Sequence, residues 1–204
     1  LQLRPGTNVA LLNMMLYSII KENLEDKDFI TARTEGYEDF KQGILNLNID
    51  ELEKVTGVDR QLVREAAMAY ASAPNAMSFH GLGVTEHSYG TYTVMLIADL
   101  AMITGNIGRR GVGVNPLRGQ NNVQGAADMG CQPYQGAGYL DVTNPEIHKM
   151  YEEFYGAKLP LHTGYKIPQM YDAALSGKLK AIWVVGEDMA QTDPNTHHVV
   201  KALQ

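Results

Sequence analysis

The sequence predicts an α/β fold with a mostly parallel sheet, and three observations lead to this prediction. Segments with helical periodicity recur along the chain, from Val9–Asn23 to Asn195–Leu203. Two short apolar runs, Ala76–Phe79 and Leu179–Gly186, have the composition of buried strands. Each run ends in a glycine turn that leads into a helix, and helices that alternate with buried strands are typical of parallel sheets.

Length and composition limit the possible functions. A chain of 204 residues suffices for one large or two small domains. The 17 basic and 23 acidic side chains give a net charge of −6, so we expect no nucleic-acid partner. No apolar run approaches the roughly 20 residues of a membrane span, and no signal segment opens the chain. Because the chain starts at Leu1 rather than Met, we expect it to be a fragment.

Cysteine usage indicates a reducing, cytoplasmic compartment. Cys131 is the only cysteine, so an internal disulfide is excluded, and no Cys/His spacing is typical of zinc. We interpret Cys131 as a small apolar filler, since no partnered base is evident nearby. No metal site is expected from the side chains of this chain.

Cap residues place the helices. The turn Pro5–Asn8 precedes the first helix, with Thr7 or Asn8 as its cap, and Asp50 and Asp59 are expected to cap two later helices. Asn144, followed by proline, is expected to start another. Besides the two helices named above, helices are expected at Glu25–Thr34, Glu35–Gly43, Asp50–Thr56, Arg60–Ser72, Gly90–Thr104, Asn144–Tyr155 and Ile167–Ser176.

The run Gly105–Gly130 is the most unusual stretch of the chain. It holds seven glycines and three arginines among several Asn and Gln residues, and it shows almost no helical or strand periodicity. Glycine lets the backbone approach a ligand closely, and arginine pairs with anions such as phosphate. The run therefore predicts a loop that grips a large anionic ligand, although an ordinary surface loop would have a similar composition.

Three further loops open helices or follow predicted strands: Gly6–Asn8, Gly81–Ser88 and Gly186–Asp193. Such loops are typical of sites for phosphate-bearing cofactors. The dinucleotide motif GxGxxG is incomplete, because Glu86 replaces its third glycine. Ordinary capping or solvated turns would also explain these loops, and His80 and His87 fit polar loop positions. From the residues alone, a cofactor-binding domain and a non-catalytic scaffold both remain open.

The segment Asn115–Gly130, which reads NPLRGQNNVQGAADMG, closely resembles the catalytic subunit of molybdopterin-dependent formate dehydrogenases. These enzymes belong to the bis-molybdopterin guanine dinucleotide oxidoreductases. Other segments match in the same order, and the resemblance covers essentially the whole chain: Leu3–Asn13, Gly81–Thr85, Met102–Gly108, His162–Tyr165 and Gly186–Asp193. It implies parts of two Rossmann-like lobes with formate dehydrogenase/DMSO reductase-like domains, at residues 1–120 and 121–204.

The resemblance also implies site residues. Arg118 matches the family's active-site arginine, which would orient formate beside the metal. Glu86 stands where relatives carry Gln. The cofactor-binding positions implied by the match are Gly6, Thr7, Asn8, Gly81, Gly83, Val84, Glu86, Gly119, Gln120, Gly186, Glu187, Asp188, Thr192 and Asp193.

The implied reaction is oxidation of formate to carbon dioxide, with two electrons passed to Mo or W on bis-molybdopterin guanine dinucleotide. The family's Cys or selenocysteine metal ligand and its [4Fe-4S] cysteines lie upstream of the matched region, so we expect an internal segment that is inactive alone. Its expected partners are formate, the remainder of its own polypeptide and electron-transfer subunits. The alternatives are a related molybdopterin enzyme with another substrate, such as a nitrate reductase, and a scaffold relative in an electron-transfer complex.

Overall fold

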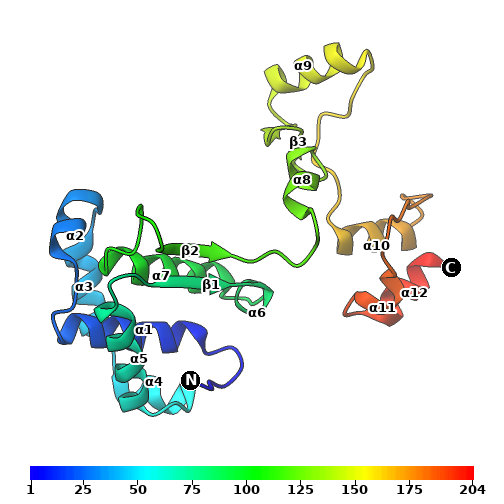
Figure 1. Cartoon of the computed structure of the whole chain (residues 1–204). Helices are drawn as coiled ribbons and strands as arrows, with labels where there is room; N and C mark the ends of the chain where they lie inside the picture. Colours follow the sequence, from blue (N-terminus) through cyan, green and yellow to red (C-terminus); the bar gives the residue numbers. More distant parts are fainter. The chain divides into compact units, whose positions relative to one another are not determined.

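The computed structural model describes residues 1–204 as two units, Leu1–Asn121 and Asn122–Gln204 (Figure 1). Helices combine with a parallel pair of strands in the first unit, which confirms the predicted α/β class. The assignment of each unit to a cofactor-binding lobe stays a prediction. The longest helices have 14 residues, and no helix is long and apolar enough to cross a membrane.

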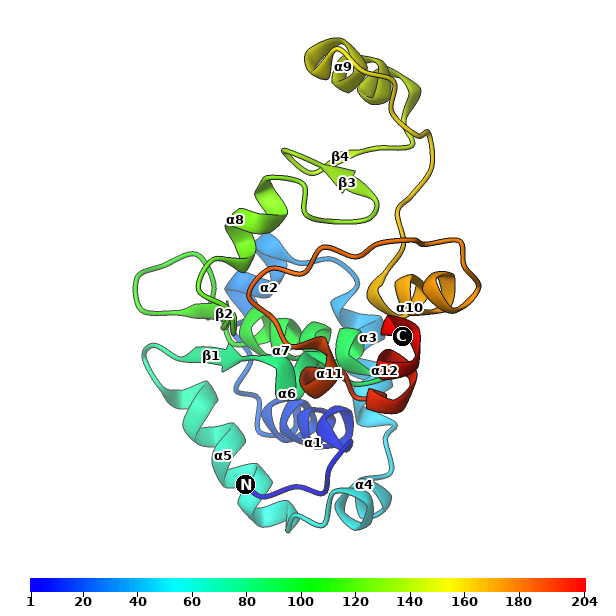
Figure 2. The same ribbon diagram turned by 90° about the vertical axis from the view of Figure 1, so that its right-hand side faces the viewer.

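The first unit is built around helix α1, which packs against α3, α4, α5 and α7 (Figures 1 and 2). Asp59 caps α5 as predicted, since its carboxylate accepts from Gln61 N at 2.7 Å and from Leu62 N at 3.3 Å. The elements of this unit are α1 Asn8–Lys21, α2 Lys27–Arg33, α3 Tyr37–Leu45, α4 Ile49–Thr56, α5 Arg60–Ser72, β1 Met77–His80, α6 Leu82–Thr85, α7 Gly90–Ile103 and β2 Gly113–Pro116.

One predicted cap is wrong, and a second is correct in position but lacks the side-chain hydrogen bond. Helix α4 is capped by Asn48, whose side chain accepts from Glu51 N at 3.3 Å, so the helix starts one residue before Asp50. Thr7 precedes α1, but its hydroxyl donates to Arg4 O at 2.6 Å instead of accepting from the helix. At α4, the side chain of Asn48 takes the place of the expected Asp50. At α1, the Thr7 hydroxyl bonds to Arg4 O instead of to an N–H group of the helix.

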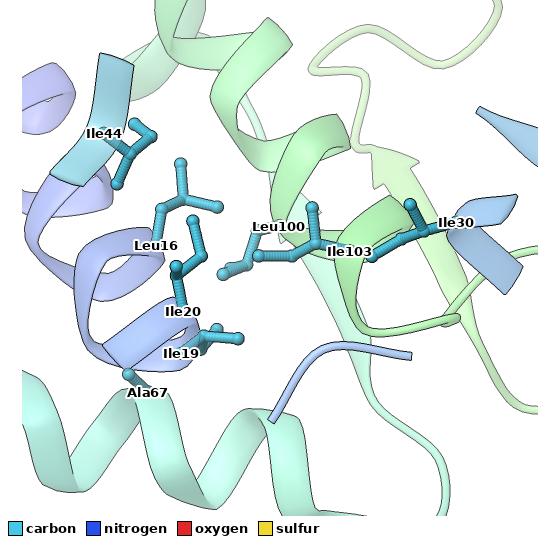
Figure 3. Close-up of a cluster of buried hydrophobic side chains, with 8 residues drawn as sticks. All are labelled: Leu16, Ile19, Ile20, Ile30, Ile44, Ala67, Leu100 and Ile103. Atoms are coloured by element: carbon cyan, nitrogen blue, oxygen red, sulfur yellow. The ribbon is translucent and has the colours of Figure 1, made fainter. Parts of the chain in front are cut away.

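Apolar side chains from five helices meet in the core of the first unit (Figure 3). Removing such side chains from water stabilises the fold by about 1.5–3 kcal/mol each. A second cluster of Met14, Val58 and Val63 lies between α1 and the segment around α5. The main cluster comprises Leu16, Ile19, Ile20, Ile30, Ile44, Ala67, Leu100 and Ile103.

Strands β1 and β2 form a parallel pair, with Met77 opposite Gly113 and His80 opposite Pro116. Helices α6 and α7 provide the crossover that a parallel connection requires, and α7 packs on both strands. The predicted strand Ala76–Phe79 is therefore shifted by one residue. It is also less buried than expected, because Phe79 lies on an exposed face.

The glycine-rich run contains more regular structure than predicted. Residues Gly113–Pro116 form β2, and Val123–Asp128 form helix α8. Asn122 caps α8 by accepting from Gly125 N at 3.3 Å. The strand was missed because its partner is β1, which lies more than thirty residues earlier in the sequence.

The second unit contains a short antiparallel hairpin and five helices. Asn144 caps α9 as predicted, accepting from Glu146 N at 2.9 Å, and Pro145 occupies the first turn. Helix α12 packs against α10 and α11, and it buries Val199. The elements are α8 Val123–Asp128, β3 Gln135–Gly136, β4 Leu140–Asp141, α9 Pro145–Tyr155, α10 Ile167–Leu175, α11 Met189–Thr192 and α12 Thr196–Leu203.

The predicted strand Leu179–Gly186 is wrong for this chain. The segment forms no strand, and Trp183 and Val185 are 92% and 80% exposed. A strand needs a neighbour to satisfy its backbone N–H and C=O groups. Neither strand pair of the chain extends to this segment, so its apolar side chains stay uncovered.

Candidate cofactor-binding loops

Two of the predicted loops leave the same edge of the parallel pair. β1 ends at His80 and β2 at Pro116, and the pairing continues where Leu117 N donates to His80 O at 2.7 Å. The loops Gly81–Glu86 and Arg118–Gln120 follow directly. The structure therefore brings together two groups of candidate residues that are more than thirty positions apart in the sequence.

The two loops approach each other at glycines, which carry no side chain. A Cβ added at Gly81 would lie 3.6 Å from Leu117 O, and one added at Gly119 would lie 3.9 Å from Leu82 Cδ1. A Cβ added at Gly83 would meet nothing within 4 Å. Backbone is thus accessible to a ligand along this edge, as side-chain-free positions allow.

The loop Gly81–Glu86 is held by its own hydrogen bonds. Val84 N and Thr85 N donate to Gly81 O at 3.0 and 3.2 Å, and Glu86 N donates to Leu82 O at 2.9 Å. These bonds define the short helix α6. The side chain of Glu86 is exposed and takes part in no hydrogen bond, so it is available to a ligand or to solvent.

The arginines of the glycine-rich run have different surroundings. Arg109 donates to Pro74 O at 2.8 Å, to Asn75 Oδ1 and to Asn106 Oδ1, so it holds the chain together. Arg118 and Arg110 are exposed, and neither guanidinium makes a hydrogen bond or ion pair. Gln120, two residues after Arg118, is also exposed. Arg118 is therefore a free cation beside the glycine loops.

The turn Gly6–Asn8 leads into the first turn of α1. Gly6 has a φ of 81°, a conformation that favours glycine. No side chain caps the helix, so the first N–H groups of α1 keep their capacity to bind an anion. Helix α6 lies on the side of the unit where α1 begins (Figures 1 and 2).

The remaining candidate residues form one turn in the second unit, around α11. Thr192 Oγ1 donates to Glu187 Oε1 at 3.1 Å, and Gln191 Nε2 donates to Asp188 Oδ2 at 2.9 Å. Gly186 opens the turn with a φ of 68°. Carboxylates here are partly engaged by donors of the same turn, and their other oxygens remain open to a ligand.

Asp193 closes this turn through Tyr171, whose hydroxyl donates to Asp193 Oδ2 at 2.5 Å. Burial, together with the hydrogen bond to Asp193 and the nearby carboxylates, raises the pKa of Tyr171 to about 12. The phenol therefore stays a hydrogen-bond donor throughout the physiological pH range. Both residues line a pocket of about 160 Å³, to which Trp183 and Glu187 also contribute.

The structure also shows residues whose role the sequence did not indicate. Cys131 is exposed rather than buried as an apolar filler, so that interpretation is wrong. It lines a pocket of about 750 Å³ together with Tyr134 and Tyr165. His80, expected in a polar loop, is instead the buried last residue of β1. No pattern in the sequence marks either environment, because both depend on packing.

No group of three or more His, Cys, Asp and Glu side chains in the chain is arranged to hold a metal ion. The open features are instead the glycine loops with the free Arg110 and Arg118 in the first unit, and carboxylates on a turn in the second unit. The glycine loops and the arginines suit a ligand that carries negative charge, whereas the carboxylates suit the N–H or hydroxyl donors of a ligand.

Comparison with known proteins identifies the family. The family model described as molybdopterin oxidoreductase matches residues 1–204. The F420-dependent formate dehydrogenase subunit alpha of Methanocaldococcus jannaschii is 47% identical over 100% of this chain and 30% of its own length. Formate dehydrogenase H of Escherichia coli is 43% identical over 99% of this chain and 28% of its own length.

A solved structure agrees with the fold. Acetylene hydratase from Pelobacter acetylenicus superposes on 98% of this chain and 30% of its own, with a TM-score of 0.65 at 19% identity. The chain thus spans about 30% of the length of each of these three relatives. Because the family model covers every residue, the resemblance noted in the sequence is confirmed, and the chain belongs to the molybdopterin oxidoreductase family.

Proposed function

We propose that this chain is a segment of a molybdopterin-dependent formate dehydrogenase that cradles bis-molybdopterin guanine dinucleotide and supplies an active-site arginine. One observation carries the proposal. In a chain of this family, the loops Gly81–Glu86 and Arg118–Gln120 meet at one edge of the parallel strand pair. The names of the similar formate dehydrogenases support formate as the substrate.

The residues at this edge fit a pterin. Gly81, Gly83 and Gly119 leave backbone accessible, and a flat heterocycle with polar edges can approach such backbone closely. When bound, the cofactor supplies the Mo or W centre that takes two electrons from formate. The metal's protein ligand and the [4Fe-4S] cluster would come from the remainder of the polypeptide, and electron-transfer subunits would take the electrons onward in the cytoplasm.

Arg118 has the properties that formate recognition requires. Formate is a small carboxylate, and a guanidinium group binds a carboxylate through two parallel N–H···O bonds. Arg118 has no competing partner in the chain, so its donors are free. Its positive charge can hold formate in place and stabilise negative charge that develops during the reaction.

The other loops suit the nucleotide parts of the cofactor. The uncapped first turn of α1, after Gly6 and Thr7, offers N–H groups and a positive helix dipole to phosphate. The turn with Glu187, Asp188 and Asp193 offers carboxylate oxygens to the N–H donors of guanine or to ribose hydroxyls. Each loop thereby offers groups that suit one chemical part of such a cofactor.

The test uses the full-length protein. Arg118→Ala should lower formate-dependent dye reduction by roughly 100-fold or more, while pterin and metal content stay near those of the wild type. Arg110→Ala is the matched control, because Arg110 is an exposed arginine of the same run that also lacks partners. Activity of the Arg118 variant equal to that of the control would contradict the assigned role.

A second measurement tests the nucleotide loop. Replacing Asp188 and Asp193 by Asn should lower the amount of pterin that co-purifies with the protein, because the acceptor oxygens lose their charge. Pterin content equal to that of the wild type would show that this turn does not hold the cofactor.

A further inference from the structure

A cavity of about 630 Å³ opens in the first unit, between helix α2 and the segment that follows α7. The side chains that line it are Asp26, Phe29, Arg33, Met102, Ile107 and Arg109. Asp26 N donates to Ile103 O at 2.8 Å, which ties the start of α2 to the end of α7. A Cβ at Gly105 would overlap the carboxylate of Asp26. The two walls of the cavity are therefore joined directly to each other.

The cavity lies at the amino end of the strand pair. Arg109, which lines it, donates to Pro74 O at 2.8 Å, and Pro74 lies just before β1. The loops Gly81–Glu86 and Arg118–Gln120 instead follow the carboxyl ends of β1 and β2. Figure 1 shows the same separation, with α2 near the start of the strands and α6 beyond their ends. The cavity is therefore separate from the loops proposed to hold the pterin.

Two arginines line the cavity, and neither forms an ion pair. Arg33 is exposed, and its guanidinium makes no hydrogen bond. Arg109 donates only to uncharged oxygens, which hold its guanidinium in position but leave its charge uncompensated. Asp26 is the one carboxylate in the lining. Two guanidinium groups and one carboxylate sum to a charge of +1, although the whole chain has a net charge of −6.

Apolar side chains form the rest of the lining. Phe29 and Met102 are partly buried, and Ile107 is 37% exposed. A ligand with an apolar body would gain from covering this surface, because contact removes apolar area from water. Guanidinium groups bind a carboxylate through paired N–H···O bonds. An organic carboxylate would therefore use both parts of the lining, whereas an inorganic anion would use only the arginines.

We propose that this cavity binds a small organic monocarboxylate with an apolar body, such as an aromatic acid. Arg33 supplies the free guanidinium for the carboxylate, and Arg109 adds a second positive charge that the chain holds in place. Phe29 contacts the apolar body. The carboxylate of Asp26 favours a singly charged ligand over a doubly charged phosphate, because like charges repel.

The test uses full-length protein that carries Arg118→Ala, which removes the other arginine proposed to bind a carboxylate. Benzoate is the probe, and isothermal titration calorimetry measures its binding. We expect saturable binding with a Kd roughly tenfold lower than that of acetate, because the ring covers apolar surface. Adding Arg33→Ala should raise the Kd of benzoate roughly tenfold or more. Lys27→Ala is the matched control, since it removes an exposed cation without a partner from the same helix, outside the cavity.

Three results would overturn the inference: no saturable binding of benzoate, tighter binding of inorganic phosphate than of benzoate, or an equal Kd in the Arg33 and Lys27 variants. Arg33 is exposed and makes no contact that the fold needs, so its replacement leaves the cavity in place. The readout involves neither pterin content nor formate oxidation. Failure of the proposed function would therefore leave this inference standing, and the reverse also holds.

Discussion

Replacing Asn106 by Ala should loosen strand β1, because this one amide joins three parts of the first unit. Asn106 is 1% exposed. Its Oδ1 accepts from Ala76 N at 3.0 Å and from Arg109 Nη2 at 3.2 Å, and its Nδ2 donates to Thr104 Oγ1 at 2.9 Å. Ala76 directly precedes β1, and Thr104 follows α7, so the amide connects the strand to the helix that packs on it.

The free-energy cost of Asn106→Ala follows from the hydrogen bond that each partner of Asn106 loses. Ala76 N–H loses its acceptor in a partly buried position, which costs about 1–3 kcal/mol. Thr104 loses a donor but keeps its own bond to Leu100 O at 2.7 Å. That loss amounts to about 1 kcal/mol. Arg109 still donates to Pro74 O and is exposed, so its contribution is small. The total of about 3 kcal/mol corresponds to a roughly 100-fold change in the opening equilibrium.

Hydrogen exchange followed by mass spectrometry measures this opening directly. The peptide that contains residues 76–80 should exchange roughly 100-fold faster in Asn106→Ala than in the wild type. Asn46→Ala is the control, since Asn46 is exposed and its side chain makes no hydrogen bond. Acceleration of less than about threefold would refute the reasoning, because that corresponds to under about 0.7 kcal/mol.

Two further substitutions test packing and charge. Gly90→Ala should lower the thermal midpoint, because the added Cβ would overlap the backbone oxygen of Thr85. This is expected even though alanine is the better helix former by about 1 kcal/mol. A raised midpoint would show that Thr85 can move aside. Burial raises the pKa of Glu25, but its backbone hydrogen bond and the hydrogen bonds from Tyr37 and Lys41 lower that pKa by more. The pKa of this carboxyl group therefore lies below the usual 4.5. The stability contributed by this carboxylate is then present above pH 4.5 and lost as the pH falls below it. Glu25→Gln should therefore make the urea midpoint depend less on pH between about pH 7 and about pH 3, and an unchanged pH dependence would contradict this.

The sequence was sufficient for the longer helices and most of their ends, but it missed the short helices α8 and α11. Asp59 and Asn144 cap the helices that they were predicted to cap, because an N-cap bond joins residues two or three positions apart. The misplaced cap at Asp50 shows the limit of such local rules, since Asn48 offers the same chemistry two residues earlier.

The strands were predicted less well, because a strand depends on a partner that is distant in the sequence. Leu179–Gly186 has the stronger strand composition but finds no partner in this chain and stays exposed. Gly113–Pro116 has almost no strand composition and is nevertheless paired with β1. Pairing, rather than intrinsic propensity, decides which segment becomes a strand.

For the candidate site, too, some features follow from the sequence and others only from the structure. The sequence by itself determined the family and marked the glycine loops and Arg118, because these residues are contiguous motifs whose chemistry can be recognised without a fold. Only the tertiary structure decided that Gly81–Glu86 and Arg118–Gln120 share one edge, that Arg109 is engaged while Arg118 is free, and that His80 is buried without a partner. The physical reason is that proximity, burial and hydrogen-bond satisfaction are properties of packed elements, and the register of β1 against β2 sets all three at this edge.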